Sequence, residues 1–189
     1  MGNPYTTNAT VDKDFYIMNE AGSDVMAEAT SSSTGVVAPM QGIFVKATEA
    51  GQTVTFTPAT SGKSVSDNRS AVVMNLSQNR GGVIDRAIVR FGNSNTLPKL
   101  QLFENSTKLY IPQYGEDFAI VSAEAQGEMP VNFKAAKNGT YTLSFNTENI
   151  EMGYLHLIDN MTGNDVDLLA TPSYTFDART TDYTSLLSL

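Results

Sequence analysis

One short stretch gathers most of the residue types that could do chemistry. Residues 153–169, GYLHLIDNMTGNDVDLL, hold the only histidine of the chain and five Asp or Asn side chains within Asp159–Asp167. Such a group could hold calcium, but an EF-hand loop needs oxygen ligands at its first, third and fifth positions. Counted from Asp159, the third and fifth positions are Met161 and Gly163. The spacing therefore predicts a turn whose Asp and Asn side chains cap backbone groups, and a looser calcium site within this segment stays open as the alternative.

The histidine, His156, could also serve as a zinc ligand or a general base. A zinc site requires three or four His, Cys or carboxylate ligands, and the chain has one His and no Cys. A Ser-His-Asp arrangement is conceivable because Ser and Asp are plentiful, but no G-x-S-x-G nucleophile motif occurs. His156 alternates with Leu155 and Leu157, which predicts a structural side chain on a strand with cross-strand contacts.

Residues 60–64, TSGKS, are similar to the end of a phosphate-binding loop. The full motif requires Gly five residues before Gly62, and that position is Thr57. The residues that follow predict a turn and a strand, whereas phosphate binding needs the N-terminus of a helix at that point. The similarity therefore predicts no nucleotide site.

A pair of carboxylates could hydrolyse a glycosidic bond, but with twenty Asp and Glu residues such pairs arise by chance. Asp85 stands out among these acids because it lies in an apolar segment beside Arg86, with Arg90 close by. We predict that Asp85 is a structural residue held in a salt bridge.

Sugar-binding platforms usually offer exposed aromatic rings, and the chain has no Trp. Tyr5, Tyr110 and Tyr114 lie in loop-like or strand-edge segments and are the candidate sugar contacts. Tyr residues in such places more often cover the edge of a core with the hydroxyl in water. The sequence thus assigns no catalytic, cofactor-binding or metal-ligating residue.

Composition narrows the classes of protein to which the chain can belong. The 189 residues carry a net charge of −8, and the twelve basic residues are scattered, which argues against binding to nucleic acid or to an anionic membrane. No apolar run is long enough to span a bilayer, so we expect no membrane insertion. The first residues lack the basic and apolar regions of a signal peptide, so an exported form would have had its targeting segment removed.

The elements that must position these side chains are strands. Residues 41–58 and 71–91 each contain two alternating segments around a Gly-containing loop, which predicts two hairpins. Seven further strand candidates follow residue 117 at a spacing near ten residues, which is typical of a β-sandwich. Apolar residues at helical spacing do not persist over a dozen positions anywhere, so we expect almost no helix.

We therefore predict an all-β protein of two consecutive β-sandwich domains. The predicted boundary, near residues 114–118, separates a jelly-roll-like sandwich over residues 1–115 from an immunoglobulin-like sandwich over residues 116–189.

Several phrases of the sequence also occur in an order that resembles a known family. They are GNPY, FYIMNEAG, VVAPMQGIFVKA, MPVNFKAAKNGTYTLSF, YLHLIDNMTGNDVDLL and PSYTFDARTTDY. Together they resemble the C-terminal β-rich region of large secreted and cell-surface proteins of Bacteroidetes-type bacteria, most strongly from Met129 to Tyr183. The resemblance implies an exterior location and implies no catalytic residues. Because that region continues on both sides in the family, we expect the chain to be part of a longer polypeptide.

These observations favour a non-catalytic module that acts as a structural, spacer or adhesion unit of a bacterial secreted or cell-surface protein. Its expected partners are other domains of the same polypeptide, with glycans or surface proteins as further candidates, and no cofactor or metal is expected. Two alternatives stay open, a glycan-binding module and a carboxylate-based glycoside hydrolase.

Overall fold

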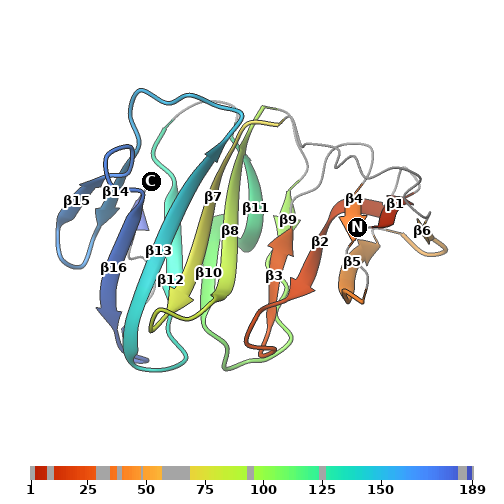
Figure 1. The fold of residues 1–189 in the computed structure, drawn as a ribbon, viewed down its shortest axis with the longest axis horizontal. Helices are drawn as coiled ribbons and strands as arrows, with labels where there is room; N and C mark the ends of the chain where they lie inside the picture. The colour runs from red at the N-terminus through yellow and green to blue at the C-terminus, as the bar shows by residue number, and fades with distance from the viewer. Residues whose placement is uncertain are drawn as a thin grey trace.

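The computed structural model describes residues 3–7, 11–28, 35–37, 40–47, 49–56, 69–92, 96–123, 127–182 and 187–188. These residues contain no helix and form strands along the whole chain, so the predicted all-β fold is confirmed (Figure 1). The strands in chain order are β1 (Asn3–Thr7), β2 (Val11–Met18), β3 (Val25–Glu28), β4 (Gly35–Val37), β5 (Ile43–Ala47), β6 (Val54–Phe56), β7 (Ala71–Gln78), β8 (Val83–Phe91), β9 (Leu97–Pro98), β10 (Lys108–Gln113), β11 (Glu116–Ala123), β12 (Pro130–Lys134), β13 (Gly139–Glu148), β14 (His156–Asp159), β15 (Asn164–Asp167), β16 (Ser173–Ala178) and β17 (Leu187–Ser188).

The largest sheet takes strands from most of the chain. Its order is β15-β14-β17-β12-β10-β11-β8-β7-β13-β16, and β9 pairs with β11 beside this path. The sheet curls, so that its two ends, β14–β15 and β16, lie side by side (Figure 1). The main core is enclosed inside the curl, where Leu76, Phe133, Leu143 and Leu157 from four different strands pack together. Burial of such side chains is the principal driving force for this arrangement.

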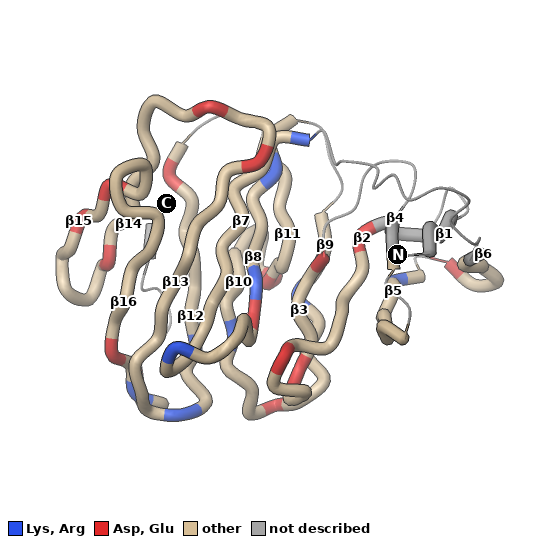
Figure 2. The backbone as a smooth tube through the Cα atoms, in the orientation of Figure 1, with Lys and Arg blue, Asp and Glu red and all other residues tan. Residues whose placement is uncertain are grey.

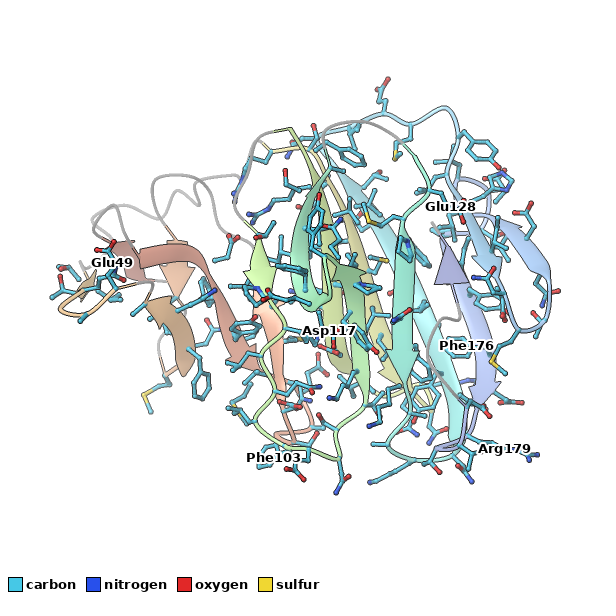
Figure 3. The ribbon with its side chains drawn as sticks, turned by 180° about the vertical axis from the view of Figure 1, so that it is seen from behind. Glu49, Phe103, Asp117, Glu128, Phe176 and Arg179 are labelled. Carbon is cyan, nitrogen blue, oxygen red and sulfur yellow. The ribbon has the colours of Figure 1, made fainter. Side chains whose placement is uncertain are left out.

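Aromatic rings fill one part of the main core. Phe133 meets Tyr141 and Phe176 edge to face, with ring centroids 4.9 and 5.1 Å apart. Figure 3 shows Phe176 on β16, at the side of the molecule where the sheet ends meet. Edge-to-face pairs of this kind add to the stabilisation that area burial provides. The cluster therefore fastens β12, β13 and β16 together.

A second core lies on the opposite face of the central strands. There Tyr16, Val25 and Ala27 of β2 and β3 cover Val73, Ile88 and other residues of β7, β8 and β11. The central strands are thus buried on both faces, which explains why β7 begins with a continuous apolar run instead of an alternating one. The covering layer reaches β7, whereas the outer faces of β13 and β16 carry exposed polar side chains.

The hairpin predicted over residues 71–91 is confirmed. β7 and β8 pair antiparallel from Ala71–Arg90 to Ser77–Val83. At the turn, Gly81 N–H donates to Gln78 O at 2.8 Å, and the two central residues, Asn79 and Arg80, have φ of 52° and 60°. Positive φ at both central positions is the mark of a type I′ turn, whose twist matches that of the two strands it joins.

The hairpin predicted over residues 41–58 is wrong in its pairing. Both strands form, but among the described residues β5 pairs with β2 and β6 pairs with β1, in two separate three-stranded sheets. The sequence gives a strand's alternation, whereas its partner depends on distant segments of the chain.

The two consecutive sandwiches predicted over residues 1–115 and 116–189 are not confirmed. The proposed boundary falls in the turn between β10 and β11, which pair with each other antiparallel. β11 also pairs parallel with β8, and β13 pairs with β7 over eight residue pairs, from Tyr141–Gln78 to Glu148–Ala71. Strands from both sides of the boundary therefore share one sheet and one core.

Candidate functional site

The β14–β15 turn shows what the clustered Asp residues do. One carboxylate oxygen of Asp159 accepts hydrogen bonds from the backbone N–H of Met161 at 2.8 Å and of Thr162 at 3.2 Å. The other oxygen accepts from the Tyr174 hydroxyl at 2.6 Å. Asp159 thereby caps its own turn and ties it to β16, at the other end of the sheet. The prediction that this segment is a capped turn is confirmed.

The surroundings of Asp159 shift the pKa of its carboxyl group. Burial acts to raise the pKa, but the hydrogen bonds from Tyr174, Met161 and Thr162 outweigh it and hold the pKa below the ordinary value of 3.8. Asp159 is therefore ionised at neutral pH and accepts charge-assisted hydrogen bonds.

The two other acids of the segment have different partners. Asp167 Oδ1 accepts from the backbone N–H of Leu169 at 2.9 Å and of Ala170 at 3.3 Å, which caps the following turn. Asp165 Oδ1 lies 2.7 Å from Nδ1 of His156. The three carboxylates are thus directed to separate partners, and the described residues contain no group of three His, Asp or Glu side chains that could hold a metal ion.

His156 lies on a strand, as predicted, and its contacts cross to the neighbouring strand. It pairs in register with Asp167 of β15 and contacts Asp165. Its ring also stacks on Tyr154, with centroids 4.1 Å apart and planes 8° from parallel. Tyr154 is exposed, so this stack lies on the outer surface of the hairpin.

The prediction of a salt-bridged Asp85 is confirmed, but its partner is Lys99. Lys99 Nζ lies 2.5 and 2.6 Å from the two carboxylate oxygens, and the backbone N–H of Leu109 donates to Asp85 Oδ2 at 2.6 Å. Burial raises the pKa of the Asp85 carboxyl, while Lys99 and the N–H groups of Leu109 and Arg86 act in the opposite direction. The contacts give Asp85 a structural role at the junction of β8 and β10.

The two arginines near Asp85 in the sequence have other partners. Because side chains alternate along a strand, Arg86 and Arg90 project from the face of β8 opposite to Asp85. Arg90 forms a bidentate pair with Asp14 of β2 at 2.6 and 2.8 Å, and both side chains are almost completely buried. Arg86 pairs with Glu28 of β3 at 2.5 Å. Both arginines thus fasten the covering layer to the central sheet.

The three candidate Tyr residues are placed differently. The ring of Tyr110 is buried, and that of Tyr114 is fully exposed in the turn between β10 and β11. Tyr5 lies in β1, in a region where side chains are not described, and residues 60–64 lie outside the described residues. No two of these candidates are shown to share a site.

A polar cleft that the sequence did not predict lies beside the β7–β8 turn. It has a volume of about 390 Å³ and is lined by Asn79, Arg80, Thr140, Thr142 and Thr175. The turn reaches over the start of β13, where the backbone N–H of Asn79 donates to Thr140 O at 3.0 Å (Figure 1). The one feature of the sequence that points to this cleft is the alternation of side chains along a strand, which places Thr140 and Thr142 on the same face.

The described residues include no helix of the length and apolarity needed to cross a membrane. Comparison of the chain with protein-family models, with curated proteins and with solved structures finds no match.

Proposed function

We propose that this chain is a non-catalytic structural module, a spacer or adhesion unit of a bacterial secreted or cell-surface protein. Its direct partners would be other domains of the same polypeptide, with surface proteins as further candidates. The sequence phrases that resemble surface proteins support the exterior location. The way in which the layers are fastened supports the mechanical role.

The observation that carries the proposal is the set of buried polar contacts between layers. The Arg90–Asp14 pair joins β8 to β2, and the Tyr16 hydroxyl of β2 donates to the backbone oxygen of Pro98. These contacts lie beside the apolar second core, where water does not compete for the same groups. The covering layer is therefore bound to the sheet by directional contacts as well as by apolar burial.

The direction of the chain through the molecule also suits a spacer. β1 and β14, which pairs with the last strand, β17, lie in opposite halves of the molecule along its longest axis (Figure 1). A pull on the two ends would therefore be carried across the main sheet and the covering layer. Structural work of this kind needs no reactive centre.

The buried acids fit a structural role. Among the described residues, four Asp side chains are buried. Asp14 and Asp85 pair with Arg90 and Lys99, and Asp159 receives hydrogen bonds from the turn it caps. Asp24 accepts from the backbone N–H of Val25 and Leu102. Each buried acid thus neutralises a cation or caps backbone groups.

Single-molecule force spectroscopy tests the mechanical role. The chain would be placed between two reference immunoglobulin domains and stretched from its ends. We expect it to unfold in discrete steps at forces comparable with those of the reference domains, and we expect Arg90→Met to lower the force of the first step. Gradual extension at low force, with no difference between the parent and Arg90→Met, would argue against a load-bearing module.

A further inference from the structure

The outer face of the main sheet is divided into two halves of different chemistry. The half formed by β8 and the start of β7 is covered by β2 and β3, with an apolar core and the Arg86–Glu28 and Arg90–Asp14 pairs between the two layers. The half formed by β13 and β16 is open and carries Thr142, Ser144, Ser173 and Thr175 in cross-strand register. The hydroxyls of Thr142 and Thr175 lie 2.9 Å apart. A row of hydroxyl groups with fixed spacing is a suitable surface for a ligand that carries hydroxyl groups of its own.

The cleft described above lies on this open half and adds one cation to it. Arg80 lines the cleft beside Asn79 and three Thr side chains. Arg80 forms no ion pair with any carboxylate that the structure describes. A guanidinium group donates two parallel hydrogen bonds and pairs best with a planar carboxylate. The lining therefore offers one anion-binding group next to several donors and acceptors for hydroxyls.

The backbone at the turn gives a second, independent indication. Arg80 has φ of 60°, a left-handed conformation that L side chains rarely adopt. Gly is the favoured residue at this position of such a turn, and the chain instead places its two glycines at the next positions, Gly81 and Gly82. Residues in such conformations cluster at functional sites; Met40 and Tyr114 also adopt positive φ, so the conformation of Arg80 supports the assignment together with the cleft that it lines.

The charge around the cleft agrees with an anionic ligand. Basic residues lie along the chain near the lower ends of β13 and β16 (Figure 2), and Arg179 lies at the end of β16 (Figure 3). Lys137 precedes β13 by two residues. Two acids lie at the same end, where Asp177 accepts from the Thr140 hydroxyl at 2.7 Å and Asp182 accepts from the Arg179 backbone N–H at 2.7 Å. Neither of these hydrogen bonds supplies a compensating cation. Arg80, Lys137 and Arg179 outnumber these two acids, so this end of the molecule is more basic than the chain as a whole, whose net charge is −8.

We propose that the cleft binds one uronate residue of an acidic polysaccharide. The sugar carboxylate pairs with Arg80, and the ring hydroxyls exchange hydrogen bonds with Asn79 and the three Thr side chains. A neutral sugar fits the lining less well, because it has no anionic group to pair with Arg80, and none of the described lining residues offers an aromatic ring to stack against a sugar face instead. Such a site would be separate from the structural role proposed above and does not depend on it.

Titration calorimetry with the intact chain tests this site. The probe is a trisaccharide of galacturonate, and its fully methyl-esterified form is the neutral control with the same hydroxyls. We expect the acid to bind at least tenfold more tightly than the ester, and its binding to weaken as NaCl is raised. Galacturonate monosaccharide should also bind, because one residue fills the cleft, whereas acetate should not bind measurably.

The key variant is Arg80→Gly, which removes the guanidinium and places the favoured residue in the turn. We expect it to lower the affinity for the acidic trisaccharide at least tenfold, while the Tm stays the same or rises by a few degrees. Arg179→Gly is the matched control, because it removes another cation at the same end without touching the cleft lining, and it should change the affinity less than threefold. Thr142→Val should weaken binding while keeping the fold.

Three results would overturn the assignment. They are the absence of saturable binding by the acidic trisaccharide, equal affinity for the acid and its ester, and unchanged affinity in Arg80→Gly. Binding of acetate as tight as that of the sugars would likewise show a bare anion site and not a sugar site. An equal loss of affinity in Arg179→Gly and Arg80→Gly would show that the ligand responds to the overall positive charge at this end of the molecule and not to contacts within the cleft.

Discussion

Lys99 and Asp85 form an ion pair inside the protein, with Nζ 2.5 and 2.6 Å from the two carboxylate oxygens and both side chains nearly inaccessible to water. Removing one partner of such a pair leaves an uncompensated charge, which costs more than the pair itself contributes. We expect Lys99→Met to lower the free energy of unfolding by about 3–5 kcal/mol at pH 7. Urea denaturation followed by circular dichroism measures this change.

A double variant separates the charge from the packing. Asp85→Asn combined with Lys99→Met removes both charges, so it should recover most of the stability lost in Lys99→Met alone. The exposed Lys46 provides the control, because Lys46→Met should change the free energy of unfolding by less than about 0.5 kcal/mol. A double variant as unstable as the sum of the two single variants would contradict the pairing.

The pH dependence of the Lys99→Met variant has a definite sign. Burial raises the pKa of Asp85 above 3.8, so the folded protein holds this proton more tightly than the unfolded chain does. Through Asp85, the free energy of unfolding therefore rises as the pH falls from the raised pKa toward 3.8. Loss of Lys99 strengthens this effect, so the difference between parent and variant should shrink on acidification.

The sequence indicated this ion pair only in part. An acid within an apolar segment predicts a cationic partner, and the Lys99–Asp85 pair confirms this prediction. Arg86 and Arg90 cannot be this partner, because side chains at odd and even positions of a strand point to opposite faces of the sheet, and Asp85 is at an odd position of β8. Lys99 was not recognised because it belongs to another segment and reaches Asp85 only through the fold.

The same distinction explains how much of the fold was predictable. The β7–β8 hairpin is local, and its alternation and turn residues predicted both strands and their pairing. The parallel pairing of β8 with β11 and the pairing of β7 with β13 are not local. Their choice depends on which apolar faces can be buried together, and no short window of the sequence contains that information. The two-domain prediction, which is not confirmed, rested on counting strands, and a count does not show which strands pair.

The cleft beside Arg80 illustrates a similar limit. Alternation in β13 predicts that Thr140 and Thr142 share a face, but Thr175 joins them only through the pairing of β13 with β16. Arg80 reaches the same place because the β7–β8 turn lies over the start of β13. Three separate segments form the cleft, and none of them carries a recognisable motif.

The hydrogen bond from Tyr174 to Asp159 predicts a stability difference that depends on pH. Tyr174→Phe removes the hydroxyl that donates to the carboxylate, so we expect the free energy of unfolding to fall by about 1 kcal/mol at pH 7. Because the folded pKa of Asp159 lies below 3.8, this contribution is present above 3.8 and is lost as the pH falls through the folded pKa. Urea denaturation at pH 7 and near pH 3 measures both values.

Tyr154→Phe is the control for this prediction. Its ring is exposed, so loss of the hydroxyl should change the free energy of unfolding by less than about 0.5 kcal/mol at either pH. A loss in Tyr174→Phe that is equally large at both pH values would show that the hydroxyl acts through packing and not through the ionised carboxylate.

His156→Ala tests the structural reading of the single histidine. The ring stacks on Tyr154 and contacts Asp165 at the surface, so its removal should lower the free energy of unfolding by no more than about 1 kcal/mol. Thermal denaturation checks this value. A variant that keeps its fold but loses affinity for the acidic trisaccharide would require a role for His156 in binding.

Lys108 and Lys134 face each other directly across β10 and β12, and this like-charge pair predicts a stabilising substitution. Burial lowers the pKa of Lys108, and the charge of Lys134 lowers it further. Lys134→Glu replaces repulsion by attraction between opposed side chains, so we expect the free energy of unfolding to rise by about 0.5 kcal/mol. The gain should diminish in 1 M NaCl, where the Debye length is about 3 Å.

Lys46→Glu is the control for this prediction. It makes the same charge change on β5, outside the curled sheet, and should give a smaller effect. A gain from Lys134→Glu that persists at high salt would show that the substitution acts through strand propensity or packing and not through the pair of charges.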